Sequence, residues 1–177
     1  MKRPTFLWQT TGFAIATLWG TLLHFLYDWS GQSPWVAPFS GVNESTWEHM
    51  KLLYWPLLLF GILQFFFFRD LPGFWWVKLM GTLAGLLLIP VLFYTYNGAI
   101  GKSPDWVNIA IFYIASASAF FIEWRLFQAQ IVTWKKGWLA FIFLVMLGAL
   151  FVVFTFSPPQ LPLFCDPESG QYGIYEP

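Results

Sequence analysis

The stretch GVNESTWEHMKLLYWPLLLFGILQFFFF, residues 41–68, decides what fold to expect. Its first part, up to Lys51, is dense in polar groups, and the remainder is an almost uninterrupted apolar run that ends at Phe68. A helix needs about 20 mostly apolar residues to cross the hydrocarbon of a bilayer. The stretch therefore predicts a transmembrane helix over residues 47–68 with a polar group at its entry.

Four other segments have the same character. They cover residues 5–29, 74–96, 106–128 and 134–156, and Gly, Pro, Asn and charged residues separate them. Only 10% of the chain is charged, whereas a soluble domain typically has about 25%. The sequence predicts an all-α membrane protein: a bundle of five transmembrane helices in one domain, residues 1–177, with a polar tail over residues 157–177.

The basic residues predict the orientation. With the N-terminus in the cytoplasm, seven of the nine Lys and Arg residues lie on or near the cytoplasmic side: Lys2, Arg3, Arg69, Lys78, Arg125, Lys135 and Lys136. Only Lys51 and Lys102 lie outside. We therefore expect a cytoplasmic N-terminus and an extracytoplasmic tail, which carries Glu176 among its acids.

Composition also limits the partners. The net charge is zero and no basic run occurs, so nucleic acid is not an expected partner. The expected surroundings are a lipid bilayer, in a prokaryotic cytoplasmic membrane, with other membrane subunits or a second copy of the chain as further candidates. The single cysteine, Cys165, excludes an intramolecular disulfide.

Two features predict contacts between helices. Small residues recur at four-residue spacing, which lets helix backbones approach closely in lipid, at Gly12, Ala16 and Gly20 and again at Gly81 and Gly85. Lys78 and Glu123 fall at similar depth on the cytoplasmic side. We expect a structural ion pair between them, with a proton relay as the alternative.

The polar groups of three segments converge at the extracytoplasmic face in this topology. His24 and Asp28 lie near the end of the first segment, residues 43–51 open the second, and Tyr94 lies near the end of the third. Both histidines of the chain are therefore expected on one side and at similar depth. Ionisable groups at the edge of hydrocarbon are costly and are candidates for function.

A structural interpretation accounts for part of this group. Ser45-Thr46-Trp47-Glu48 has the form of a capping box, and Lys51 is placed to pair with Glu48. Asp28, four residues from His24, is placed to hold the ring of that histidine in one tautomer.

The leading functional interpretation is a pocket that binds a small ligand, a lipid headgroup or an ion. Its candidate residues are His24, Asn43, Glu44, Glu48, His49, Lys51 and Tyr94. A divalent metal such as zinc is one candidate ligand, with His24, His49 and Asp28 as metal ligands and Glu44 or Glu48 as further carboxylates. Glu48 and His49 are adjacent and point about 100° apart on a helix, so they do not easily face one point.

Two other hypotheses remain open. One is a metal-dependent membrane hydrolase, in which Glu44 or Glu48 is the general base. The other is an accessory subunit of a larger membrane complex. The sequence has no HExxH pair, Walker loop, GxGxxG, GxSxG or CxxC motif, so the reactions tied to those motifs have no support.

The chain also resembles a family of small prokaryotic integral-membrane proteins catalogued as a domain of unknown function. The resemblance rests on LHFLYDWSG, residues 23–31, on VNESTWEHMK, residues 42–51, which has the form VNES-x-WEH-x-K, and on FYTY, residues 93–96, with Gly98 and Gly101. It continues in the tail around Asp166, Gly170, Tyr172 and Gly173. The resemblance implies a five-helix membrane protein and emphasises the same extracytoplasmic residues, but it implies no activity.

Overall fold

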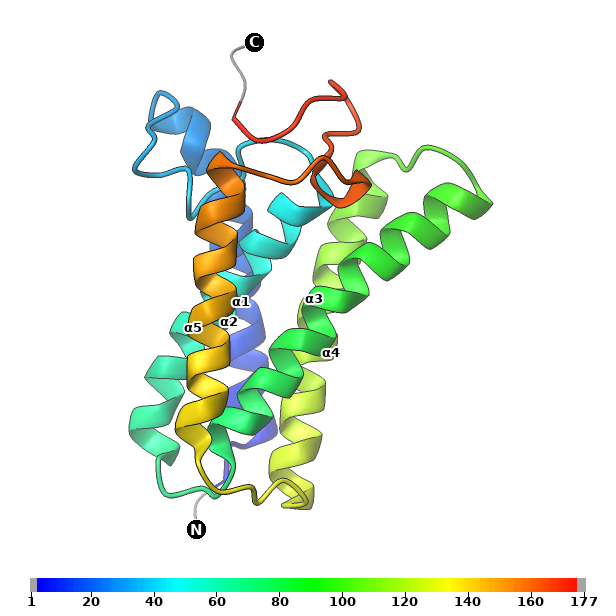
Figure 1. Cartoon of the computed structure of the whole chain (residues 1–177). Helices are drawn as coiled ribbons and strands as arrows, with labels where there is room; N and C mark the ends of the chain where they lie inside the picture. The colour runs from blue at the N-terminus through cyan, green and yellow to red at the C-terminus, as the bar shows by residue number, and fades with distance from the viewer. Residues whose placement is uncertain (1–2, 175–177) are drawn as a thin grey trace.

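The computed structural model describes residues 3–174, and this part of the chain is helical without any strand. The helices are α1 (Phe6–Trp29), α2 (Thr46–Phe68), α3 (Phe74–Ala99), α4 (Asp105–Ala129), α5 (Gly137–Phe156) and the short 3-10 helix η1 (Pro162–Phe164). One isolated bridge joins Cys165 to Tyr172 in the tail. The N-terminal end of the chain and the tail lie at opposite ends of the bundle (Figure 1).

The prediction of an all-helical chain with five long helices is confirmed. Each observed helix end lies within three residues of the predicted one. α3 continues three residues past its predicted end at residue 96, through Asn97-Gly98 to Ala99. The Asn97 side chain donates to the Phe93 carbonyl and accepts from Ser103 N, which ties the end of the helix to the following loop. Lys2 and Glu176, used in the orientation argument, lie outside the described residues.

Four of the five helices, α2 to α5, are long and apolar enough to cross a membrane. α1 is long enough but falls short in composition. Its sequence carries polar residues along its length, among them Gln9, four threonines, His24 and Asp28. Of the five predicted transmembrane helices, four therefore have the length and the apolar composition that a spanning helix needs.

α2 lies at the centre of the bundle, which explains why its apolar run has no polar face. α1, α3, α4 and α5 all pack on it, and Leu53, Tyr54 and Leu57 are completely buried. The small-residue faces predicted from the sequence are contact faces: Gly12 and Gly20 of α1 pack against aromatic rings of α2 and α4, and Gly81 and Gly85 of α3 pack against α4. A close-packed core of this kind holds the helix ends in fixed positions.

The predicted ion pair between α3 and α4 is also present. Lys78 Nζ lies 2.6 Å from Glu123 Oε2 and 3.3 Å from Gln64 Oε1 of α2. The two charged side chains are 1% and 0% exposed. Three helices are therefore joined by one buried polar contact in the half of the bundle away from the tail.

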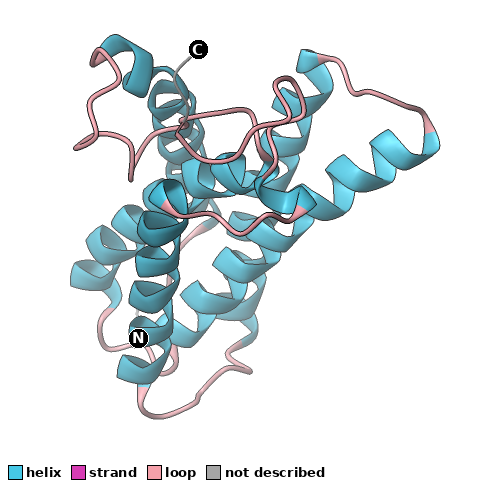
Figure 2. Ribbon diagram, turned by 45° about the horizontal axis from the view of Figure 1, so that its top comes forward, coloured by secondary structure: helices cyan, strands magenta, loops and turns pink. Residues whose placement is uncertain are grey.

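One end of the bundle gathers most of the irregular structure, and we call it the tail end. α1, α3 and α5 end there, α2 and α4 begin there, and the loop of residues 30–45 and the C-terminal tail lie across it (Figures 1 and 2). The last turns of α3 lean away from the other helices at this end (Figure 1). The tail end is where the two histidines lie.

Candidate metal centre

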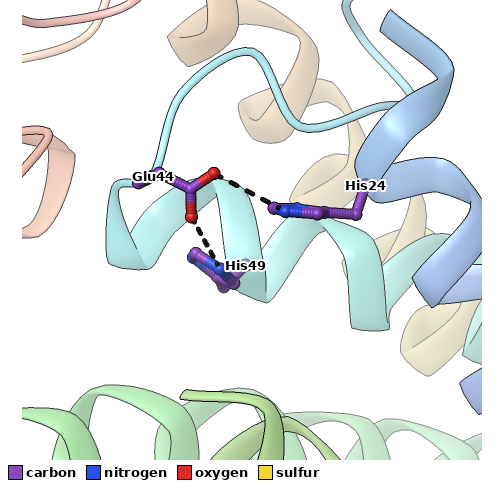
Figure 3. Close-up of side chains that lie close together, drawn as sticks. All are labelled: His24, Glu44 and His49. Atoms are coloured by element: carbon purple, nitrogen blue, oxygen red, sulfur yellow. Dashed lines mark ion pairs between the residues drawn. The ribbon is translucent and has the colours of Figure 1, made fainter. Parts of the chain in front are cut away.

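Three side chains meet at the tail end: His24 of α1, Glu44 of the loop and His49 of α2 (Figure 3). His24 Nε2 lies 3.5 Å from Glu44 Oε1, and His49 Nε2 lies 3.5 Å from Glu44 Oε2. The two imidazole centroids are 5.7 Å apart. The predicted convergence of the two histidines is thus seen in the structure, and we call these residues the His24–Glu44–His49 cluster.

Ser40 ties the loop that carries Glu44 to α1. Its hydroxyl is buried, donates to the Leu23 carbonyl and accepts from Tyr27 N at 2.8 Å. The hydroxyl thus stands between two backbone groups that an unbroken helix would join to each other. Because this occurs one residue before His24, the loop is fixed against the turn of α1 that presents the first imidazole.

The start of α2 fixes the second imidazole. Ser45 is the N-cap, and its hydroxyl accepts from Glu48 N as predicted. The second half of the expected capping box is not formed, because Ser45 N donates to Asn43 Oδ1 and the Glu48 carboxylate accepts from Val42 N instead. The cap nevertheless places His49 in the first turn, on the side that faces α1.

A hydrogen bond to the backbone sets the protonation of the His49 ring. Nδ1 lies 3.0 Å from the Ser45 carbonyl oxygen, which can only accept, so Nδ1 carries the proton in this bond. In a neutral imidazole the lone pair is then on Nε2. This lone pair faces the Glu44 carboxylate, so two acceptors face each other, which favours a cation or a proton between them.

The spacing of the donor atoms fits a small divalent ion. The three donor atoms, one from each residue, lie within 4.8 Å of one another. Zinc bonds of about 2.0–2.2 Å in tetrahedral geometry put neighbouring ligand atoms about 3.3–3.6 Å apart. Each histidine Nε2 lies 3.5 Å from one oxygen of the Glu44 carboxylate, which is within this range, and the two rings face different oxygens of that carboxylate. Two imidazoles and one carboxylate are also a donor set that zinc uses in sites with an open coordination position.

The cluster opens onto a cavity of about 440 Å³. Its polar lining includes Asp105 and Asn108 at the start of α4 and Glu168 of the tail, in addition to the cluster itself. Its apolar lining is Gly20, Phe25, Leu52, Ile109, Phe112 and Tyr113, together with the methyl-bearing Thr21. No Lys or Arg is present among these described lining residues, so the cavity is acidic.

Glu48 and Lys51, both predicted as ligand-binding residues, lie together in a separate buried pair. Lys51 Nζ is 2.5 Å from Glu48 Oε2, and the side chains are 0% and 3% exposed. Lys51 also donates to the Ala37 carbonyl and to Thr155 Oγ1, each at 2.8 Å. The pair holds the loop and α5 against α2, which is a structural task outside the cavity.

Three other predicted residues are not part of the cluster. Asp28 is exposed at the end of α1, beyond His24. Asn43 links the loop to the tail, since its amide donates to the Gly173 carbonyl at 2.9 Å. Tyr94 is exposed near the end of α3. None of these three lines the cavity.

Four polar residues of the site were not among the sequence-based candidates: Ser40, Asp105, Asn108 and Glu168. Asp105 has a visible signal, because it is an acid at the predicted extracytoplasmic start of a helix. Ser40 and Glu168 have none, since their positions depend on how the loop and the tail fold back over the helix ends.

The chain was also compared with known proteins. Residues 2–174 match a family described as "Family of unknown function (DUF6512)". The protein belongs to this family. The match covers almost the whole DUF6512 chain, including every helix and the candidate metal centre. No curated protein and no solved structure matches it.

Proposed function

We propose that this DUF6512 protein is a membrane protein that binds a divalent metal ion of the zinc class through His24, Glu44 and His49. The observation that carries the proposal is the orientation of His49. With Nδ1 bonded to the Ser45 carbonyl, Nε2 is directed at the Glu44 carboxylate. Metal-ligating histidines commonly donate their second ring N–H to a backbone carbonyl or a carboxylate in this way.

The proposal includes five transmembrane helices, with the N-terminus in the cytoplasm of a prokaryotic cell and the metal site on the extracytoplasmic side. The excess of Lys and Arg at the opposite end supports this orientation. The polarity of α1 is compatible with a bilayer. Its Thr10, Thr17 and Thr21 hydroxyls donate to carbonyls within the helix, and Gln9 is buried inside the bundle.

Metal analysis tests the proposal directly. The protein purified in mild detergent without chelators is expected to contain about one zinc ion per chain, and less than about 0.1 would overturn the proposal. His24→Ala and His49→Ala should each weaken zinc binding by at least about tenfold. Asp28→Asn is the matched control, because it changes an exposed acid on the same helix and should leave zinc binding unchanged.

Acid should release the metal. Protons compete with the ion for imidazole and carboxylate ligands, so lowering the pH from about 7.5 to about 5 is expected to empty the site. The proposal would be contradicted if zinc stayed bound at pH about 5 and both histidine variants also kept their zinc. The ion would then lie at a site other than the His24–Glu44–His49 cluster.

A metal-dependent hydrolase is the second candidate, and the carboxylates beyond the cluster favour it. A site with three protein ligands leaves a position for water, and an adjacent carboxylate can accept its proton. Glu44 would serve as a ligand and Glu48 is tied to Lys51, so Asp105 or Glu168 is the better general base. Zinc-loaded protein should cleave a long-chain p-nitrophenyl ester, and Asp105→Asn or Glu168→Gln should abolish cleavage but keep the zinc. A zinc-loaded wild type without activity would exclude this candidate.

A further inference from the structure

Two cavities lie along the same helix–helix contact, between α1 and α4. The larger contains the His24–Glu44–His49 cluster, and α1 and α4 supply most of its walls. The second has a volume of about 220 Å³ and lies closer to the N-terminal end of α1. Its lining comes entirely from these two helices: Phe6, Gln9, Thr10 and Phe13 of α1, and Ala117, Phe120, Phe121 and Trp124 of α4. We call this line of contact the α1–α4 seam.

The two cavities are linked by an aromatic contact. Phe13 lines the smaller cavity and Tyr113 lines the larger one, and their ring centroids are 6.4 Å apart in an edge-to-face arrangement. Both cavities are bordered by exposed side chains on the outside of the bundle: Phe25 (45% exposed) and Tyr113 (41%) at the larger one, and Phe6 (58%) and Phe121 (53%) at the smaller one. In a bilayer the seam would therefore be reached from the side, through the region of the acyl chains.

The lining changes from polar to apolar along the seam. The ionisable residues are confined to the tail end. The smaller cavity has no ionisable residue in its lining: its walls are five aromatic side chains and Ala117, with Gln9 and Thr10 as uncharged polar residues. This is the pattern that suits an amphiphile, with a polar head at the cluster and a hydrocarbon chain along the seam.

The charge of the larger cavity restricts the head. Glu44, Asp105 and Glu168 line it without a Lys or Arg among the described lining residues. A divalent ion offsets two of these three negative charges, so an additional net negative charge is unfavourable. A zwitterionic head fits better, because a phosphate oxygen can reach the metal while the ammonium lies near Asp105 and Glu168.

We infer that the site binds a single-chain zwitterionic phospholipid, with its head at the metal and its chain along the α1–α4 seam across Phe13 and Tyr113. This inference rests on the proposed metal site for the contact with the head. It also gives a role to the smaller cavity, whose lining includes none of the three proposed metal ligands.

The test is native mass spectrometry of zinc-loaded protein with palmitoyl lysophosphatidylcholine, hexanoyl lysophosphatidylcholine and palmitoyl lysophosphatidylglycerol. Ala117→Phe fills the smaller cavity and should weaken palmitoyl lysophosphatidylcholine binding by at least about tenfold, because several methylenes lose their apolar contact. The hexanoyl lipid, whose chain is too short to reach that cavity, should be unaffected. Ala149→Phe, at an exposed position of α5 outside the seam, is the matched control and should change neither.

The outcomes separate this inference from the metal proposal. Zinc content is measured on the same samples, and a wild type without zinc overturns the metal site itself. With zinc bound, equal effects of Ala117→Phe and Ala149→Phe overturn the seam as the place of the chain. Tighter binding of the anionic lipid, or equal binding with and without zinc, overturns the assignment of the head.

Discussion

At the scale of single residues, one hydroxyl and one carbonyl define the candidate metal centre. The Ser40 hydroxyl fixes the loop to α1 beside His24, and the Ser45 carbonyl orients the ring of His49. Neither group is a proposed ligand, yet each positions one. Surrounding groups that orient metal ligands in this way strongly influence metal affinity.

Lys51 is the residue whose replacement should cost the most stability at the tail end. Lys51→Met leaves the Glu48 carboxylate buried without its cation, which is expected to destabilise the fold by about 3–5 kcal/mol. Thermal unfolding in mild detergent measures the effect. Lys102→Met, at an exposed position of the same end, is the control and should unfold like the wild type.

A double replacement tests whether the charge is the cause. Glu48→Leu combined with Lys51→Met removes both charges and should recover much of the lost stability, because no unpaired charge remains buried. If Lys51→Met alone unfolds at the same temperature as Lys102→Met, the buried pair does not stabilise the protein.

At the scale of helices, the contact between α3 and α4 depends on a buried charge and on small residues. Lys78 of α3 pairs with Glu123 of α4, and Gly81 lies directly against the Glu123 side chain. Close approach of the two backbones is thus required for the ion pair to form. The ion pair and the close helix packing at Gly81 therefore depend on each other, and a separate variant is needed to test each of them.

Glu123→Gln should lower stability because Lys78 then keeps a buried charge without its carboxylate. A loss of about 3–5 kcal/mol is expected, again measured by thermal unfolding in detergent. Asp70→Asn, an exposed acid in the loop after α2, is the control. An unchanged melting temperature in Glu123→Gln would show that the ion pair contributes nothing to stability.

Gly81→Ala tests the close approach. A Cβ at this position would lie about 3.1 Å from the Ala119 carbonyl oxygen and would collide with the Glu123 side chain, so the variant should be destabilised. Gly98→Ala in the same helix meets no atom within 4 Å and should be neutral or stabilising by up to about 1 kcal/mol. If both variants melt alike, helix propensity rather than packing governs α3.

At the scale of the whole molecule, the sequence was sufficient for the helices and for the meeting of the two histidines. Long apolar runs with clear breakers identify helices locally, and the alternation of helix directions brings His24 and His49 to one end. The sequence left two roles open for Glu48, a pair with Lys51 and a place in the pocket, and the structure shows the pair with Lys51. The fold of residues 30–45 over the helix ends decides whether the Glu48 carboxylate faces the cavity or Lys51. No local sequence pattern predicts the conformation of this loop.

The orientation in the membrane gives the prediction at this scale. In a Cys165→Ser background, Gln160→Cys in the tail should react with a membrane-impermeant maleimide on intact cells. Thr133→Cys, between α4 and α5, should react only after permeabilisation. The opposite pattern would reverse the proposed orientation, and labelling of both on intact cells would contradict α5 as a spanning helix.

The link between Asn43 and Gly173 has a consequence for how the protein is made. Residues separated by 130 positions are joined by this bond, and Glu168 of the same tail forms part of the cavity wall. During synthesis the two histidines leave the ribosome early, but the cavity around them lacks one wall until the tail that carries Glu168 has been translated. A nascent chain in which helices α1 to α5 have all formed would therefore still have an incomplete cavity.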